Sequence, residues 1–495
     1  MSLQKKVLNG SLWSLAISWF NRTIGLISTI ILLRILEPAD FGLVALATMV
    51  MLLFMSLCEL GIREYIIKTA DISDDMVNSA WTLQIVINII ISLMLLMTAP
   101  FVAVLLENDK LTDILRVIAF IPSIAALNNP GGTLLNKKME YAKTSKISIV
   151  AKLITAPLTV YIAIVHESYW ALIWGNVASI TLTFIFSYIF VSYRPRLRFS
   201  DFKIIFSETK WLVIGTFTSF IRAKTENFII NSKFGADGVG LYSTSIEFSH
   251  LPLTDIISPA SKPLLAGVSS IRTGLSDAYK AVLKYLYIAL FFIIPAIVGI
   301  FIVGDLFVEV VMGPQWVKAI ITFKIVSLLM IVYPLYNCCR IIMFLSNDLK
   351  ILTTMDVISI SVMVAFLLPS YVDNLEILAW GRVMIGLLFA LALVTTLHLR
   401  YKLEVKPIFT LFITVFLLCI PFAVSIYLLK PLILEHGAAI TLVITGVLGC
   451  IIYLGTVFFS IRTLAKQNEY FLFTKEFIEN NVNSVKRKCI NLLAK

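Results

Sequence analysis

Residues 211–262 read WLVIGTFTSFIRAKTENFIINSKFGADGVGLYSTSIEFSHLPLTDIISPASK, two apolar segments with charged side chains near their middles. The first segment contains Arg222, Lys224 and Glu226. The second contains Glu247, His250 and Asp255. An ionised group at the centre of a membrane helix costs about 2.5–3.5 kcal/mol on insertion scales, so several together indicate a surface that faces a bundle interior or a wet cavity. We therefore interpret this hairpin as the lining of a transport path.

The composition around this hairpin is that of a membrane protein. Of the 495 residues, 59% are hydrophobic and only 14% are charged, and the mean hydropathy is +0.92. Soluble domains contain about 45–50% apolar residues. Apolar runs of about 20 residues, the length of a spanning helix, recur along almost the entire chain. The sequence predicts an all-α polytopic membrane protein with no room for a sizeable soluble domain.

Fourteen apolar runs of spanning length follow one another. The predicted spans are approximately 11–33, 41–61, 81–106, 114–135, 147–165, 169–193, 211–231, 239–262, 285–304, 319–345, 351–370, 376–398, 407–429 and 438–461. An even number places both termini on one side of the membrane. About 27 basic residues lie in loops and tails on that side and about 5 on the other, which predicts that both termini are cytoplasmic.

Charge, cysteines and motifs limit the possible partners and cofactors. The net charge of +11 follows from the basic residues on one membrane side, so no nucleic-acid partner is expected. The six cysteines lack CxxC spacing and lie mostly in apolar runs, so we expect no disulfide and no metal site. No GxxxxGK[ST] phosphate loop is present to use ATP. We expect no cofactor, and an ion gradient or the membrane potential as the energy source.

The two halves of the chain resemble each other weakly. A shift of 198 positions aligns Trp13 with Trp211, Ile31 with Ile229, Gly42 with Gly240 and Leu43 with Leu241, and both copies place a turn, EPADFG or GADGVG, between two spans. The shift predicts two parallel six-span halves followed by a final helix pair. The predicted organisation is an N-terminal lobe at 1–200, a C-terminal lobe at 201–400, a final pair at 401–461 and a basic cytoplasmic tail at 462–495.

Positive charges at membrane depth predict an anion-binding cavity. Arg22 and Arg222 occupy equivalent spans of the two halves, and guanidinium groups bind phosphate bidentately. An alternative is that Arg222 only neutralises Glu226, which lies four residues further along the same helix. The candidate substrate-binding residues are Asn21, Arg22, Arg222, Lys224 and Arg340.

Acidic groups in the same hairpin are candidates for coupling to ions or protons. Burial raises the pKa of a carboxyl group, so a carboxylate in a membrane span can load and release a proton. The candidate coupling residues are Glu226, Glu247, His250 and Asp255. A lone histidine in a helix is more often a hydrogen-bonded packing residue, and this alternative stays open for His250. Pro130, followed by two glycines, breaks the fourth predicted span, either as a gating point or as a tolerated kink.

Several loose motifs resemble one family. They are LLRILEPADFGLVALA, CELGIREYII, FIPSIAALNNPGGTLLNKKMEYAK, YWALIWGN with RPRLRFS, and FGADGVGLYS. In these stretches the chain resembles the multidrug/oligosaccharidyl-lipid/polysaccharide flippase superfamily, and within it the bacterial lipopolysaccharide and exopolysaccharide exporters. The resemblance implies fourteen helices in two six-helix lobes around a central cavity. It also implies alternating access that carries an undecaprenyl-diphosphate-linked oligosaccharide from the cytoplasmic to the periplasmic leaflet, with Arg22 and Arg222 as the fitting cavity arginines.

Three alternatives compete with this interpretation. A multidrug extruder of the same superfamily usually binds organic cations through acidic residues, which a cationic cavity disfavours. A glycan polymerase or ligase needs reactive side chains beside a sizeable outer loop, and the outer loops here are short. A purely structural scaffold would give no function to the charged side chains at the membrane midplane, which are costly to insert. We expect a transporter rather than an enzyme, in the bacterial cytoplasmic membrane, with a lipid-linked oligosaccharide, the lipid bilayer and glycan polymerisation or export proteins as its partners.

Overall fold

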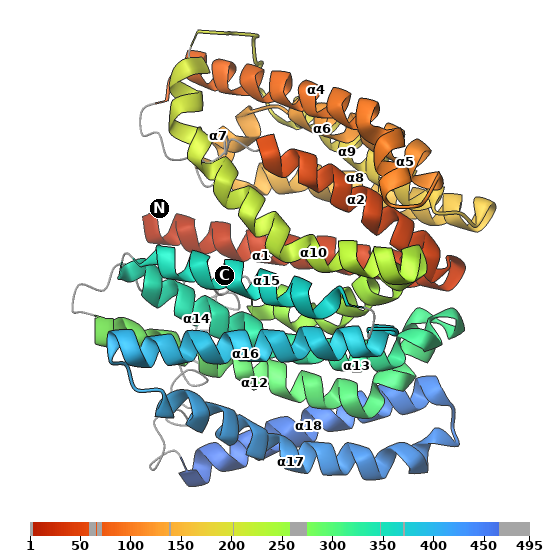
Figure 1. Cartoon of the computed structure of the whole chain (residues 1–495), viewed down its shortest axis with the longest axis vertical. Helices are drawn as coiled ribbons and strands as arrows, with labels where there is room; N and C mark the ends of the chain where they lie inside the picture. Colours follow the sequence, from red (N-terminus) through yellow and green to blue (C-terminus); the bar gives the residue numbers. More distant parts are fainter. Residues whose placement is uncertain are drawn as a thin grey trace, which may run out of the picture. The chain divides into compact units, whose positions relative to one another are not determined.

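A computed structural model describes residues 3–58, 66, 72–137, 140–200, 202–257, 275–346, 348–369 and 372–464. Every regular element within these ranges is a helix (Figure 1). This confirms the predicted all-α class. The chain divides into two compact units, the first formed by Met1–Thr244 with Leu368–Leu375 and the second by Ser245–Leu367 with Glu376–Lys495.

The first unit contains the helices of the N-terminal part of the chain. They are α1 (Leu3–Ile35), α2 (Pro38–Cys58), α4 (Asp74–Leu105), α5 (Lys110–Ile118), α6 (Phe120–Ala126), α7 (Gly131–Lys137), α8 (Tyr141–His166), α9 (Trp170–Phe190) and most of α10 (Phe202–Ser249). Helix α10 is two helices joined at Gly235, whose φ of 62° and ψ of −165° are not helical. The predicted seventh and eighth spans therefore meet at this glycine.

The second unit contains the remaining helices and the end of α10. They are η1 (Leu253–Ile257), α12 (Leu275–Phe307), η2 (Val308–Met312), η3 (Pro314–Ala319), α13 (Ile320–Ser327), η4 (Leu328–Ile331), α14 (Val332–Leu345), α15 (Leu349–Leu367), α16 (Leu375–Tyr401), α17 (Lys406–Leu434) and α18 (Ala438–Leu464). The predicted spans between 285 and 461 all fall on these helices.

Among the described residues, 10 helices are long and apolar enough to cross a membrane. The bent pair Lys110–Ala126 and Gly131–Lys137, with 58° between its parts, raises this number to 11 if it forms one span. The chain is therefore a multi-pass membrane protein. The number of fourteen spans, the cytoplasmic termini and the lobe boundaries at 200 and 400 stay predictions, and most of the predicted basic tail lies outside the described residues.

Local sequence explains where the helices of the first unit begin. Pro38 is the first residue of α2, where its missing N–H costs nothing, and the carboxylate of Asp40 accepts a hydrogen bond from the N–H of Glu37 at 3.2 Å. Helix α4 begins after Ser73, whose hydroxyl accepts a hydrogen bond from the N–H of Met76 at 3.3 Å. Both starts satisfy backbone donors that the first helical turn leaves free.

The predicted break at Pro130 is present, between α6 and α7. Asn129, which is 5% exposed, bridges the break: its Oδ1 accepts from the N–H of Gly131 at 2.9 Å and its Nδ2 donates to the carbonyl of Tyr193 at 2.7 Å. The N–H of Asn129 donates to the hydroxyl of Ser187 at 3.0 Å. Non-helical backbone at membrane depth is thus satisfied by protein groups, as an apolar environment requires.

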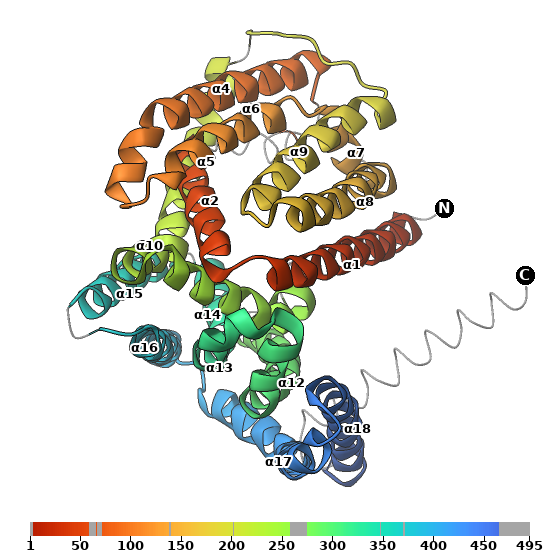
Figure 2. The same cartoon turned by 90° about the vertical axis from the view of Figure 1, so that its right-hand side faces the viewer.

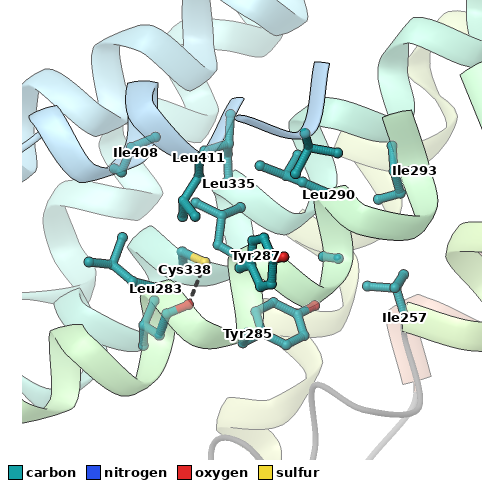
Figure 3. Packing of buried hydrophobic residues seen from close by; sticks show 14 of the residues in the cluster. Ile257, Leu283, Tyr285, Tyr287, Leu290, Ile293, Leu335, Cys338, Ile408 and Leu411 are labelled. Atoms are coloured by element: carbon teal, nitrogen blue, oxygen red, sulfur yellow. Dashed lines mark hydrogen bonds between the residues drawn. The ribbon is translucent and has the colours of Figure 1, made fainter. Parts of the chain in front are cut away.

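The core of the second unit lies between α12, α14 and α17 (Figure 3). Leu283 and Leu290 of α12, Leu335 of α14 and Leu411 of α17 are buried side chains of this core. The thiol of Cys338 on α14 points to the backbone of α12 and donates to the carbonyl of Val282 at 3.8 Å. As predicted for a cysteine in an apolar run, Cys338 is a free thiol buried among apolar side chains.

Candidate functional site

The first part of the candidate site is the seam between α1 and α8, which pack along each other in the first unit (Figure 2). Asn21 on α1 donates from Nδ2 to the hydroxyl of Ser148 on α8 at 3.1 Å. One turn further, Gly25 faces Lys152, whose Nζ would lie 3.2 Å from a Cβ placed on the glycine. Both helices advance by four residues between these two contacts, so one continuous face of α1 meets one face of α8.

Lys152 places a second positive charge beside Arg22. Arg22 and Gly25 are three residues apart on α1 and therefore neighbours on its surface, and the ammonium group of Lys152 lies over Gly25. Both Arg22 and Lys152 are half-buried, and Lys152 belongs to the apolar helix segment Lys143–His166. In the described part of the chain, Lys152 forms no ion pair with an acidic side chain. This pair of cations, with Asn21 and Ser148, is the α1–α8 cluster.

Lys152 is not among the site residues predicted from the sequence. Its position could have indicated a role, because a lysine at the sixth position of the predicted span 147–165 is as unusual as Arg22 in the predicted span 11–33. Gly25, which faces this lysine, has no side chain that could mark it as a site residue. Only the packing of α1 on α8 shows that Gly25 leaves space for the lysine. Asn21 Oδ1 is buried and accepts no hydrogen bond from any described residue, which leaves one acceptor in the α1–α8 cluster.

The charged residues of α10 are the second part. Glu226 is 8% exposed, and its Oε2 accepts a hydrogen bond from the hydroxyl of Tyr242 at 3.3 Å. The two residues lie on either side of the Gly235 break, so this bond joins the two segments of α10. Lys224 is half-buried. The backbone of Arg222 is helical, whereas its side chain lies outside the described residues.

The remaining predicted residues belong to the second unit and are not gathered into one cluster. His250 Nε2 lies 3.2 Å from the carbonyl of Val326 on α13, which favours the packing interpretation of this histidine. Glu247 is exposed, and Asp255 accepts a hydrogen bond from the hydroxyl of Thr254 at 3.2 Å. Arg340 is exposed and donates from Nη2 to Asn337 Oδ1 at 3.2 Å.

The second unit also holds charged contacts that sequence position did not reveal. Asp356 is only 9% exposed and accepts from the hydroxyl of Tyr336 at 3.1 Å. Lys430 on α17 binds both carboxylate oxygens of Asp305 on α12, at 2.8 and 2.6 Å, and the carbonyl of Ile302 at 2.8 Å. Lys324 lies 3.9 Å from the same carboxylate. These contacts join helices within the unit, and they belong to its packing rather than to the α1–α8 cluster.

The α1–α8 cluster suits an anion. Guanidinium and ammonium groups supply several N–H donors and two positive charges, which match a phosphate or diphosphate group. No group of three histidine, cysteine, aspartate or glutamate side chains in the described ranges is arranged to hold a metal ion. Because both cationic side chains are half-buried, an anion bound beside them would be partly shielded from bulk water and held more strongly than at an exposed site.

Two solved structures share the fold. The structure of the lipid II flippase MurJ in an inward closed conformation superposes with a TM-score of 0.73 at 14% identity, over 92% of this chain and 99% of the other. An inward-facing transporter of the multidrug resistance MATE family superposes with a TM-score of 0.59 at 12% identity, over 75% of this chain and 92% of the other. At these identities the similarity concerns the fold alone.

Curated relatives are similar over part of the chain. An uncharacterized membrane protein in the cps region of Klebsiella pneumoniae is 24% identical over 66% of this chain and 69% of its own length. The lipopolysaccharide biosynthesis protein WzxC of Escherichia coli strain K12 is 23% identical over 64% of this chain and 65% of its own. The succinoglycan biosynthesis transport protein ExoT of Rhizobium meliloti strain 1021 is 21% identical over 58% of this chain and 59% of its own length.

A family model described as polysaccharide biosynthesis protein matches residues 31–321, more than half of the chain. The chain belongs to this family of polysaccharide biosynthesis proteins.

Proposed function

We propose that this protein carries a lipid-linked oligosaccharide, held on undecaprenyl diphosphate, across the bacterial cytoplasmic membrane by alternating access for the synthesis of a cell-surface polysaccharide. The names of two relatives, a lipopolysaccharide biosynthesis protein and a succinoglycan transport protein, support this function. The fold shared with a lipid II flippase supports it as well. The protein would have fourteen spans with both ends in the cytoplasm, and would carry out no covalent catalysis.

The observation that carries the proposal is the α1–α8 cluster. Lys152 is a cation in the apolar segment Lys143–His166 and forms no ion pair with an acidic side chain of the described residues, so a bound anion would offset its insertion cost. Arg22 on the adjacent helix α1 adds a second positive charge. A diphosphate head group is the anionic part of a lipid-linked sugar, and its oxygens match the donors of Arg22 and Lys152. The buried Oδ1 of Asn21 would accept a hydrogen bond from a hydroxyl of the same ligand.

The other candidate residues keep their proposed roles. Arg222, Lys224 and Arg340 would complete the path for the head group, and Glu226, Glu247, His250 and Asp255 would take part in coupling. Glu226 is the strongest of the coupling candidates, because its carboxylate is buried and joins the two segments of α10 through Tyr242.

The multidrug extruder is the competing transport function. It would need acidic groups to attract organic cations, whereas the α1–α8 cluster is cationic. A glycan polymerase or ligase is the less favoured alternative. The lobe boundaries at 200 and 400, with a final helix pair and a basic tail, complete the proposal and follow from the 198-residue shift.

The experiment is a complementation assay of lipid-linked glycans. Cells that lack this protein are expected to accumulate undecaprenyl-linked repeat units on the cytoplasmic side, and the wild-type chain is expected to clear them. At matched membrane abundance, Arg22→Ala and Lys152→Met should each slow clearance about tenfold or more, because the loss of one buried charge-assisted contact costs about 1.5–3 kcal/mol. Lys152→Arg keeps the charge and should clear the intermediate at a rate close to wild type.

Arg116→Ala is the matched control. Arg116 is an exposed arginine on α5 that pairs with Asp113 at 3.4 Å, outside the α1–α8 cluster, so its loss should leave clearance unchanged. If no lipid-linked intermediate accumulates without the protein, the substrate assignment fails and the multidrug extruder becomes the favoured function. If Lys152→Met clears the intermediate as fast as wild type, the flippase function survives and the binding role of this lysine does not.

A further inference from the structure

The segment that joins α9 to α10 is extended and lies along the first turns of α4 (Figure 2). We call residues 191–200 of this segment the arginine strap. The N–H of Arg196 donates to Asn78 Oδ1 at 3.0 Å. The N–H of Arg198 donates to Thr82 Oγ1, also at 3.0 Å. Asn78 and Thr82 are one turn apart on α4 and are 8% and 1% exposed, so two buried side chains of one helix face hold alternate backbone groups of the strap.

Further contacts fix both ends of the arginine strap. Near its start, the hydroxyl of Tyr193 donates to Asn78 Oδ1 at 3.1 Å. At its end, the hydroxyl of Ser200 lies 3.2 Å from the hydroxyl of Ser79, which is completely buried. Pro195 favours the extended backbone between these ends, because its ring disfavours a helical conformation of the preceding residue. The strap is therefore held in one place on the surface of the first unit.

The arginine strap has a charged edge and an apolar edge. Successive side chains of an extended segment point to opposite sides. Because the N–H groups of Arg196 and Arg198 both face α4, these two side chains and that of Arg194 lie on one side of the strap. Leu197 and Phe199 lie on the other side, and each is 65% exposed. Two large apolar side chains thus extend from the protein surface beside three arginines.

The charged edge carries two positive charges that no acidic side chain neutralises. Arg198 pairs with Asp75 at 2.9 Å. Arg194 Nη1 donates to two backbone carbonyls of the strap, at 2.5 and 2.9 Å, and these carbonyls carry no net charge. Arg196 is exposed. In the described part of the chain, neither Arg194 nor Arg196 forms an ion pair, although Asp74 also lies at the start of α4.

The arginine strap lies at the level of the membrane surface. It follows the end of α9 and is bound to the start of α4, and both helices are long and apolar enough to cross a membrane. Lipid head groups lie at this level, and arginine pairs with phosphate bidentately. Apolar side chains beside a charged edge enter the boundary between head groups and acyl chains. The two edges of the strap match these two layers of a lipid.

We propose that the arginine strap is a binding site for an anionic phospholipid. Arg194 and Arg196 contact the phosphate of the head group, and Leu197 and Phe199 lie among the upper parts of the acyl chains. A head group such as phosphatidylglycerol keeps the negative charge of its phosphate, whereas the choline of phosphatidylcholine cancels it. The site is separate from the α1–α8 cluster, so it can fail while the transport function holds.

The first test measures how short-chain phosphatidylglycerol stabilises the purified full chain in a neutral detergent. The unfolding temperature should rise with phosphatidylglycerol, and not with phosphatidylcholine of the same chains or with inorganic phosphate. Arg196→Gln should need about fivefold more phosphatidylglycerol for the same rise, which is the contribution of one basic residue at an anionic lipid surface. Arg116→Gln, which removes an exposed arginine on α5 outside the strap, is the control and should respond as wild type.

Three results of this test would overturn the proposal. They are no rise with phosphatidylglycerol, the same response from Arg196→Gln as from wild type, and an equal rise with inorganic phosphate. The last result would show a phosphate site that needs no lipid.

The second test keeps both arginines and follows the apolar edge. Leu197→Cys is introduced into a chain whose six native cysteines have been replaced, and it carries a fluorophore in vesicles of phosphatidylglycerol with bromine in the upper part of the acyl chains. Its fluorescence should be quenched several-fold. A probe at Glu404→Cys, in the exposed turn before α17, is the control and should stay unquenched. An unquenched probe at position 197 would exclude the lipid and leave the strap to a protein partner.

Discussion

Lys152 owes its position to the absence of a side chain on another helix. Its ammonium group occupies the space over Gly25, so a cation can lie within the bundle without displacing an apolar side chain from the core. A lysine at this depth elsewhere in the chain would extend toward the membrane surface, because its long stem allows the charged end to reach water. The glycine on α1 and the lysine on α8 therefore form one packing unit, although 127 positions separate them in the chain.

Asp348 forms a bidentate ion pair with Arg400 in the turn before α15. Its two carboxylate oxygens accept from Arg400 at 3.0 and 3.1 Å, and the hydroxyl of Tyr401 donates to it at 3.0 Å. The hydrogen bonds from Arg400, followed by the one from Tyr401, hold the pKa of Asp348 below its ordinary value of 3.8. The pair joins the turn before α15 to the end of α16.

This lowered pKa predicts a pH-dependent stability. A carboxyl group whose pKa is lowered by folding stabilises the folded state at pH above its unfolded pKa of about 4, and the stabilisation disappears as the pH falls through the folded pKa. Asp348→Asn should therefore unfold at a lower temperature than wild type at pH 7, and the difference should close below about pH 4. Thermal unfolding in detergent across this pH range measures it. Asp277→Asn, which affects only an exposed pair at 3.8 Å, serves as the control and should show no such convergence.

Among the elements, the broken span α5–α7 is bridged at its break by the side chain of Asn129. Asn129→Ala would leave the buried N–H of Gly131 without its side-chain partner, whereas the carbonyl of Tyr193 keeps the hydrogen bond that Arg194 Nη1 donates at 2.9 Å. Each buried polar group left unsatisfied costs about 1–3 kcal/mol. We expect a clear fall in the unfolding temperature, measured in detergent on purified protein.

Asn88→Ala is the comparison for this substitution. The amide of Asn88 donates to the carbonyl of Gln84 on its own helix at 2.8 Å, and that carbonyl is already engaged in helical hydrogen bonding. Its loss should change the unfolding temperature little. An unfolding temperature of Asn129→Ala equal to that of Asn88→Ala would show that water replaces the lost amide, and that the break is not held by Asn129.

The elements were predictable from sequence to a greater extent than their contacts. Apolar runs bounded by charges predicted the helices, and Pro130 with its following glycines predicted the break, because both signals are local. The rotation of one helix against another depends on contacts between residues that are far apart in the sequence. Nothing in the sequence near Lys152 indicates that Gly25 faces it, and the repeat aligned Gly42 with Gly240 without indicating that the two touch. The same limit explains why Arg22 was recognised from its depth and the α1–α8 cluster was not.

At the scale of the whole molecule, the distribution of basic residues predicts the orientation in the membrane. A fluorescent protein that folds only in the cytoplasm should fluoresce when it is fused after Lys495. Alkaline phosphatase, which is active only outside the cytoplasm, should be active when it is fused in the turn at Gly437 between α17 and α18, and inactive at Lys402 before α17. An active phosphatase at Lys402, or a dark fluorescent fusion, would show the opposite orientation.

The link between Lys430 and Asp305 has a consequence for how the gene can change over generations. The helix pair α17–α18 follows the part of the chain that the repeat accounts for, and this ion pair joins it to α12 in addition to the apolar core that α12 and α17 share. The loss of Asp305 alone removes the carboxylate that the partly buried ammonium group of Lys430 contacts, whereas the loss of Lys430 alone leaves Asp305 with Lys324 at 3.9 Å. A change at Asp305 is therefore tolerated best when Lys430 changes too. In descendants of this chain the two positions should be inherited, exchanged or lost together.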